Sequence, residues 1–272
     1  MKSSRKDSGV EIRKCRTLED FEGAVEIQHR IWGGDQVVPV PIFVVAAHSG
    51  GQVLGAFEEG RMIGFTLAFA GVREGYYLHS HMAAVVPELR DRGIGRRLKL
   101  AQREDALARG IQLIEWTFDP LESKNAYFNL KKLGAIARRL IPNCYGITKS
   151  ALHHGLPTDR LVAEWWLASE RVSRAISGSG ESSFASKRTK RVALPGGWER
   201  LRAGDRDSAA KGQSEVRQKM EKLFANGYAA VGIDRNESTA EYLFVPTGKM
   251  EGLKLPVVSG SHGIRTGKRD EV

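Results

Sequence analysis

The sequence is poor in the features that mark disulfide-bonded, secreted and membrane-spanning proteins. Only two cysteines, Cys15 and Cys144, occur in 272 residues, which argues against a disulfide framework or a thiolate metal site. The longest mostly apolar stretch, residues 37–47, is shorter than the roughly 20 residues of a membrane span and contains two prolines. Residues 1–9 are polar and show no secretory signal. We therefore expect a soluble, cytoplasmic protein without a membrane partner.

The positive charge is concentrated in the last third of the chain. Residues 1–170 carry 23 Lys and Arg against 20 Asp and Glu, and residues 171–272 carry 19 against 12, for a net charge of +10. A basic balance suits anionic cofactors and polyanions alike. The densest basic run, residues 187–191, has no interleaved aromatic residues that could stack on bases, and such runs are usually solvated. We therefore do not expect nucleic acid as a partner.

The first 170 residues show the alternation of a mixed α/β (α+β) domain. Strands are predicted over 10–15, 52–57, 62–70, 76–86, 111–118, 135–141 and 160–167, and helices over 17–32, 42–48, 93–109 and 124–133. A meander of hairpins followed by β-α-β crossovers predicts a mixed central sheet flanked by helices. We assign this working domain to residues 10–170.

The composition changes after residue 170. Residues 171–192 are rich in Ser, Gly, Lys and Arg and are interpreted as a linker. Residues 193–245 are predicted to form a small extension with one helix, 207–226, and a hairpin. Residues 246–272 are interpreted as a disordered tail. The apolar residues of the extension, Val216, Met220, Phe224 and Tyr228, would pack against the first domain or against another subunit in a homodimer.

One loop has the properties of an anion-binding site. An apolar strand ends at Val85-Val86-Pro87, and Gly93-Ile94-Gly95 then opens an amphipathic helix. The first turn of a helix presents unpaired N–H groups and the positive end of the helix dipole, and glycines allow a phosphate to approach them closely. Five basic residues, Arg90, Arg92, Arg96, Arg97 and Lys99, add positive charge nearby. The sequence therefore predicts a cradle for a diphosphate, although neither a dinucleotide fingerprint nor a Walker loop is present.

The same loop resembles the acetyl-CoA signature of the GNAT N-acetyltransferase superfamily. That signature, Gln/Arg-x-x-Gly-x-Gly/Ala, is matched by Arg90-Asp91-Arg92-Gly93-Ile94-Gly95. The resemblance covers residues 10–170, in a branch with a C-terminal extension, and implies a GNAT-like fold with acetyl-CoA as co-substrate. It also implies that acetyl-CoA is bound by Val85, Val86, Arg90, Asp91, Arg92, Gly93, Ile94, Gly95, Arg96 and Asn125.

Acyl transfer to an amine calls for a general base, because most amines are protonated at pH 7. His79 and His81 lie two residues apart on the strand before the loop and should share one face. The arylalkylamine branch of the GNAT enzymes carries a similar pair. Glu115 and Glu164 each interrupt an apolar strand and are alternative bases or paired structural carboxylates. We name His81, His79 and Glu115 as catalytic candidates and place the larger effect at His81.

One expected residue is missing. Many GNAT enzymes carry a general-acid Tyr four residues before the Gly that ends the later helix, and Leu130 stands there. Either Tyr127 or Tyr145 substitutes for it, or no side-chain acid is used. We expect an N-acetyltransferase acting on an unidentified amine by direct attack in a ternary complex. The alternative is a non-catalytic CoA-binding module whose extension binds a partner. No metal site is predicted, since the pair His153-His154 has no third ligand.

Overall fold

The elements follow the predicted order over the first 170 residues. The computed structural model describes residues 9–34, 37–73, 75–147, 155–179, 188–236 and 238–249. The first part comprises β1 (Val10–Lys14), α1 (Leu18–Trp32), α2 (Val40–His48), β2 (Gln52–Glu58), β3 (Arg61–Val72), β4 (Tyr76–Val85), α3 (Ile94–Ala108), β5 (Leu113–Phe118), α4 (Ser123–Tyr127), β6 (Ile136–Ile141), β7 (Arg160–Trp166) and α5 (Glu170–Ser177). The last part comprises β8 (Lys190–Ala193), α6 (Trp198–Gly204), α7 (Arg206–Ala225), β9 (Tyr228–Arg235) and β10 (Ala240–Pro246).

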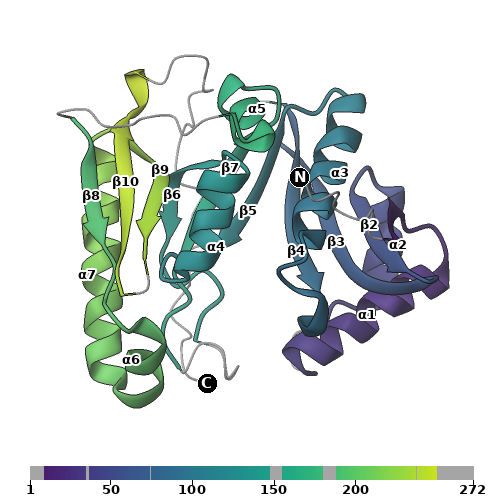
Figure 1. The fold of residues 1–272 in the computed structure, drawn as a ribbon, viewed down its shortest axis with the longest axis horizontal. Coiled ribbons are helices and arrows are strands. Elements are labelled where there is room, and N and C mark those ends of the chain that lie inside the picture. Colours follow the sequence, from purple (N-terminus) through teal and green to yellow (C-terminus); the bar gives the residue numbers. More distant parts are fainter. Residues whose placement is uncertain are drawn as a thin grey trace, which may run out of the picture.

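The ten strands of the described residues form one mixed, mostly antiparallel sheet. Their order is β1-β2-β3-β4-β5-β7-β6-β9-β10-β8, and only β4 and β5 run parallel. Helices flank this sheet, as Figure 1 shows. The predicted fold class is therefore confirmed, and the last three strands are added to the same sheet rather than forming a separate hairpin.

The start of α1 shows how local sequence fixes the first half of the sheet. Thr17 caps the helix by accepting a hydrogen bond from the Asp20 backbone, and the Asp20 side chain accepts in return from the Thr17 backbone. Arg13 on β1 donates to both carboxylate oxygens of Asp20, at 2.9 and 2.7 Å. Because Asp20 is buried, this exchange fixes α1 against the first strand.

The helices before and after β4 lie on opposite faces of the sheet. The Phe65 ring on β3 contacts Phe43 of α2, with ring centroids 5.8 Å apart. A Cβ on the preceding residue, Gly64, would instead point toward Leu98 of α3, at 3.3 Å. Successive residues of a strand face opposite sides, so α2 and α3 cover different faces.

The predicted linker is corrected by the structure over the residues described. Glu170–Ser177 form α5, capped by the Ser169 side chain, and Lys190–Ala193 form β8 at the far edge of the sheet. The last two residues of the basic run, Lys190 and Arg191, lie in this strand, where Val192 is buried and Arg191 binds Asp234 on β9 and Glu241 on β10. Residues 180–187 of the linker lie outside the described part of the chain. The domain boundaries themselves stay predictions.

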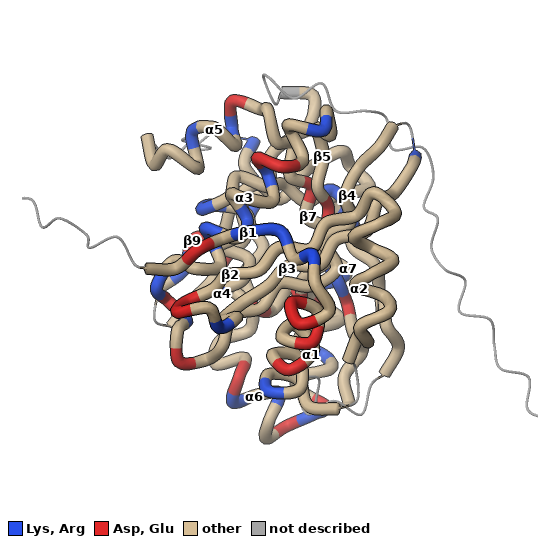
Figure 2. The backbone as a smooth tube through the Cα atoms, turned by 90° about the vertical axis from the view of Figure 1, so that its right-hand side faces the viewer, with Lys and Arg blue, Asp and Glu red and all other residues tan. Residues whose placement is uncertain are grey.

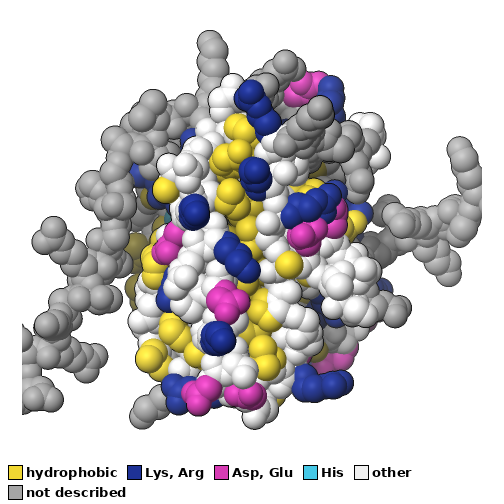
Figure 3. All heavy atoms as spheres, turned by 90° about the vertical axis from the view of Figure 1, so that its left-hand side faces the viewer, with side chains coloured by type: hydrophobic (Ala, Val, Ile, Leu, Met, Phe, Trp, Pro, Cys, Tyr) yellow, Lys and Arg dark blue, Asp and Glu magenta, His cyan; other side chains and the backbone are white. Residues whose placement is uncertain are grey.

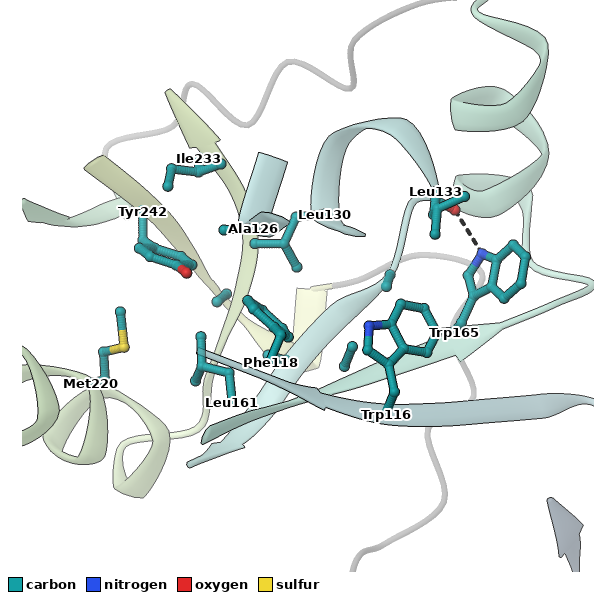
Figure 4. Packing of buried hydrophobic residues seen from close by; sticks show 14 of the residues in the cluster. Trp116, Phe118, Ala126, Leu130, Leu133, Leu161, Trp165, Met220, Ile233 and Tyr242 are labelled. Atoms are coloured by element: carbon teal, nitrogen blue, oxygen red, sulfur yellow. Dashed lines mark hydrogen bonds between the residues drawn. The ribbon is translucent and has the colours of Figure 1, made fainter. Parts of the chain in front are cut away.

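The extension shares its core with the first domain. Met220 from α7 and Tyr242 from β10 lie in one apolar cluster with Phe118, Leu161 and Leu130 (Figure 4). The buried Tyr242 hydroxyl donates to the Pro120 carbonyl at 2.8 Å. Of the two packing partners considered for the extension, the first domain of the same chain is the one observed. The tail predicted for 246–272 falls outside the described residues from position 250 onward.

Charges are mixed over the surface rather than gathered in one basic patch. Acidic residues concentrate on α1, next to the basic residues of β1 (Figure 2). On the side of β8 and α7, Lys and Arg alternate with Asp, Glu and apolar side chains (Figure 3). Within the described residues, no helix is long and apolar enough to cross a membrane.

Candidate functional site

The two parallel strands at the centre of the sheet separate soon after they meet. β4 and β5 pair only at Leu78–Ile114 and His79–Glu115, so the β5 side of residues 80–85 has no ladder partner. In Figure 1 the ends of β4 and β5 diverge. A cleft of about 670 Å³ lies there. Its walls include residues 80–85, Gly95, Leu98, Lys99, residues 116–119, Asn125, Phe128, Asn129, Tyr145, Arg160 and Trp32.

The loop that leads from β4 to α3 has the backbone geometry expected of an anion cradle. Val86 is tied to β3 by its N–H to the Ile63 carbonyl, at 3.0 Å. Asp91 and Gly93 both adopt positive φ angles, 60° and 80°. Gly93 is the N-cap of α3 and supplies no side-chain cap. The first-turn amides of α3 are therefore without a side-chain acceptor, while Gly95 lies in the cleft wall beside Val85.

Several basic side chains around this loop already form hydrogen bonds or ion pairs within the protein. Arg90 Nε donates to the Val85 carbonyl at 3.3 Å, Arg92 lies 3.6 Å from Glu58, and Arg96 donates to the Ile176 carbonyl of α5. These contacts shape the loop and keep positive charge beside it. Lys99, which the sequence placed with these residues, instead lies buried in the cleft floor.

The two candidate histidines lie close together on one side of β4. Their ring centroids are 6.4 Å apart. β4 is bulged here, since Met82 pairs with Leu67 and Ser80 with Ala68, which leaves His81 without a partner on β3. His81 lines the cleft, whereas His79 is set back from it. His81 is thus the better placed of the two to reach a bound substrate.

The electrostatic setting keeps both imidazoles neutral near pH 7. Desolvation lowers the pKa of His81 below its usual value. Desolvation, the neighbouring His81 and the charges of Arg73 and Lys99 lower the pKa of His79 to about 4. A neutral imidazole can accept a proton, so His81 keeps the form that a general base requires.

Glu115 is held in a cluster of ion pairs. It is buried and bound by Arg73 and by Arg139, the latter at 3.0 Å. Glu164, opposite it on β7, is bound by Arg138. Each carboxylate therefore has a guanidinium partner, and neither lines the cleft within the described residues. This favours the interpretation of both as paired structural carboxylates.

The wall opposite β4 contains Tyr145, named in the sequence analysis, beside three polar residues that the sequence interpretation did not single out, Thr117, Asp119 and Arg160. The Tyr145 hydroxyl lies 2.8 Å from Thr117 Oγ1, and Arg160 lies 3.8 Å from Asp119. Burial raises the pKa of Asp119. Asn125, predicted from the resemblance, also lines the cleft. Irregular segments carry several of these groups, so no periodic pattern could have indicated them.

The missing Tyr leaves an apolar side chain in its place. Leu130 is 1% exposed and points into the cluster around Phe118 and Leu133 (Figure 4). Tyr145 lies in the cleft wall, and Tyr127 does not appear there among the described residues. In the same part of the chain, no three His, Cys, Asp or Glu residues lie together as metal ligands. His153-His154 lies outside the described residues.

Comparison with known proteins identifies the class of this fold. Residues 21–134 match the model of the acetyltransferase (GNAT) family. This segment begins in α1, ends at Gly134 and includes the loop whose motif resembles the acetyl-CoA signature of that family. No curated protein matches the sequence.

Several solved structures are similar over more than half of the chain. One is the ribosomal-protein-S18-alanine N-acetyltransferase from Escherichia coli, with 17% identity, 57% of this chain and 92% of that chain covered, and a TM-score of 0.47. Another is an N-acetyltransferase from Staphylococcus aureus, with 16% identity, 59% and 99% covered, and a TM-score of 0.48. A third is NAA60 of Arabidopsis thaliana in complex with acetyl-CoA, with 15% identity, 58% and 99% covered, and a TM-score of 0.47.

Proposed function

We propose that this protein is an N-acetyltransferase that moves the acetyl group of acetyl-CoA to an amine of a small molecule or peptide. The observation that supports this most directly is the separation of β4 from β5 beyond His79, beside the glycine-capped start of α3. One end of the cleft offers amides and positive charge to phosphates. The other end offers unpaired strand backbone to a polar, extended chain.

The length of β4 matches the pantetheine arm of CoA. Ser80 and Val85 are five residues apart, or about 17 Å at the rise of a strand. The arm contains about thirteen bonds from phosphorus to sulfur. A fully extended polypeptide with the same number of backbone bonds spans ~15 Å, and we take this as the length of the extended arm. With the diphosphate at Gly93–Gly95, the thioester would lie near Ser80 and His81. The arm would pair with β4 as an added strand.

The roles of the chain's own residues follow from that placement. His81 would accept the proton of the attacking amine, with His79 behind it as a lesser, relay-like contributor. The acceptor would enter between His81 and the opposite wall with Asp119 and Tyr145. The described cleft walls include neither cysteine, which supports direct attack on the thioester rather than an acyl-cysteine intermediate. Glu115, neutralised by two arginines, is not retained as the base.

Binding can be tested with two matched glycines. Gly93 and Gly110 flank α3, with φ angles of 80° and 74°, and a Cβ on either would meet nothing within 4 Å. Glu at either position should cost about 1–2 kcal/mol of stability. Only G93E places a carboxylate beside the phosphates. At CoA 100-fold above its Kd, we expect about 2.7 kcal/mol of added stability in wild type, a comparable gain in G110E and none in G93E. Equal gains in both variants would contradict the cradle.

Turnover separates the enzyme from its alternative, a CoA-binding module without catalysis. A panel of small amines, amino acids, aminoglycosides and peptides should release free thiol from acetyl-CoA at a rate that depends on the amine. Stabilisation by CoA without amine-dependent thiol release would favour the binding module, in which the C-terminal extension would carry the partner.

A further inference from the structure

A lysine that no part of the proposed mechanism uses lies at the floor of the cleft. Lys99 lies on α3, one helical turn after Gly95, and its side chain is buried although it lines the cavity. Its Nζ lies 3.0 Å from Ser80 Oγ and 2.9 Å from Gln102 Oε1. It also lies 3.9 Å from the centre of the Trp116 ring. Burial of a lysine destabilises the folded protein, because the charged form loses its hydration. A buried lysine in a cleft wall therefore suggests a function.

The surroundings of Lys99 bind its ammonium form but also allow it to lose a proton easily. Two oxygen acceptors and one aromatic face meet the three N–H groups of an ammonium. Among the described residues, no carboxylate balances the charge. Glu115 and Glu164 lie on β5 and β7 next to Trp116 and Trp165, and therefore on the opposite face of the sheet. Burial accordingly lowers the pKa of Lys99 to about 7.

The other titratable groups on the elements around Lys99 lie to the sides. On β4 these are His79 and His81, of which His79 senses the charge of Lys99. On α3, Arg96, Arg103 and Arg97 donate to the Ile176, Leu167 and Val10 carbonyls. Of the two acidic residues of α3, Asp105 pairs with Lys14 and Glu104 is exposed. Among the described residues, the contacts of the ammonium therefore include no anion that would retain its proton.

The position of Lys99 coincides with the end of the proposed CoA arm. Ser80, its hydrogen-bond partner, is the first residue of β4 beyond the paired segment. Measured along β4 from Val85, this is the place that the sulfur of an extended arm would reach. The usual acid position is filled by the apolar Leu130. The leaving thiolate would therefore have Lys99 and Ser80 as its nearest donors.

We propose that Lys99 is the general acid of this enzyme, donating a proton to the CoA thiolate directly or through Ser80 Oγ. The inference rests on the proposed acetyl transfer. As the amine nitrogen bonds to the carbonyl carbon, the C–S bond breaks and its electron pair goes to sulfur. The Lys99 ammonium gives its proton to that sulfur, and His81 takes one from the amine. Both groups then return to their starting forms by exchange with water.

The first test uses bound CoA and does not depend on turnover. A cation 4–6 Å from the sulfur favours the thiolate, so thiolate absorbance of bound CoA should titrate at lower pH than that of free CoA. In K99M, which removes the charge at similar volume, the thiolate fraction at a given pH should fall about tenfold or more. The control is K219M, since Lys219 is exposed on α7. An equal thiolate fraction in K99M and K219M would overturn the inference.

Two further measurements keep the inference testable even if K99M does not fold. In wild type, the side-chain NMR titration of Lys99 should move to higher pH when CoA binds, because linkage is reciprocal; no movement would refute the coupling. Mass spectrometry after incubation with acetyl-CoA should show an unmodified Lys99. Stoichiometric acetylation there would make the amine an acyl acceptor and contradict the acid role. Failure of CoA to bind at all would overturn the proposed function together with this inference.

Discussion

The strands of the first domain and those of the C-terminal extension are held in the sheet in different ways. β1–β4 are paired antiparallel, with bulges in the β2–β3 and β3–β4 ladders, and β5, β7 and β6 are also joined by antiparallel ladders. In contrast, β6 meets β9 through one paired position, Ala137–Ala230. The extension is joined to the first domain by side chains instead, through the apolar cluster from Trp116 to Phe244. Backbone pairing therefore fixes the register of both walls of the cleft, whereas the place of the extension depends on side-chain packing.

The largest effect should come from removing a side chain that joins the extension to the first domain. Tyr242→Ala deletes a fully buried ring and its hydrogen bond to Pro120. We expect a loss of about 3–5 kcal/mol in the free energy of unfolding, the range for large aromatic-to-alanine changes in a core. Urea unfolding measures it.

The matched control for that change is Tyr76→Ala on β4, where the side chain is 74% exposed. It should change stability by less than about 0.5 kcal/mol. Similar small losses for both variants would show that the extension does not contribute to the core as the packing indicates.

The two walls of the cleft should differ in catalysis. His81→Gln on the β4 wall should lower turnover about 10²–10⁴-fold, the usual contribution of a general base, with CoA affinity unchanged. Turnover of wild type should rise with pH through a pKa below the ordinary histidine value, since a base must be deprotonated and desolvation lowers the pKa of His81. That rising limb should be absent in His81→Gln, and His79→Gln should have a smaller effect.

Tyr145→Phe on the opposite wall removes one hydrogen bond to Thr117 and should leave the pH profile intact. Wild-type turnover should fall again near pH 7, because an acid must be protonated and burial lowers the pKa of Lys99 to about 7. If Tyr145→Phe instead abolished the falling limb, Tyr145 and not Lys99 would be the proton donor. An unchanged rate in a double His79→Gln/His81→Gln variant would remove both histidines from the mechanism.

The smallest effect concerns the polar contacts that fix β1 to α1. The Arg13 hydrogen bonds lower the pKa of Asp20 to about 2. A lowered pKa stabilises the folded state above the ordinary carboxyl range, and this stabilisation should be lost as the pH falls from about 4 toward 2. Asp20→Asn should cost about 1 kcal/mol at pH 7 and flatten the acid limb of stability. Glu19→Gln, at an exposed position, should do neither.

Hydrophobic periodicity and turn residues were sufficient to predict the helices and strands of the first half of the molecule. The helix over 93–109 and the strand over 76–86 were predictable because Gly93 and Gly110 bound a clear helical pattern and the strand ends in an apolar run before the loop. The prediction of an anion cradle rests on Gly93 and Gly95. These are local signals, so they survive in the sequence without knowledge of the fold.

The remaining features depend on tertiary contacts. β8 was hidden in a basic run, because its single buried side chain, Val192, gives no alternation over four residues. The divergence of β4 from β5 depends on how two strands distant in sequence meet. The burial of Lys99 could have been predicted from its helical spacing: Gly95, Lys99 and Gln102 are four and three residues apart, so they share one face of α3. The positive charge of Lys99 led instead to its assignment among the basic residues around the loop.

The central claim is that the arm of CoA occupies the β5 side of residues 80–85, and amide hydrogen exchange tests it most directly. With saturating CoA, backbone amides in residues 80–85 and in the first turn of α3 should exchange more slowly, while those of the β9–β10 hairpin should remain unchanged. Binding of CoA without added protection in residues 80–85 would contradict the account.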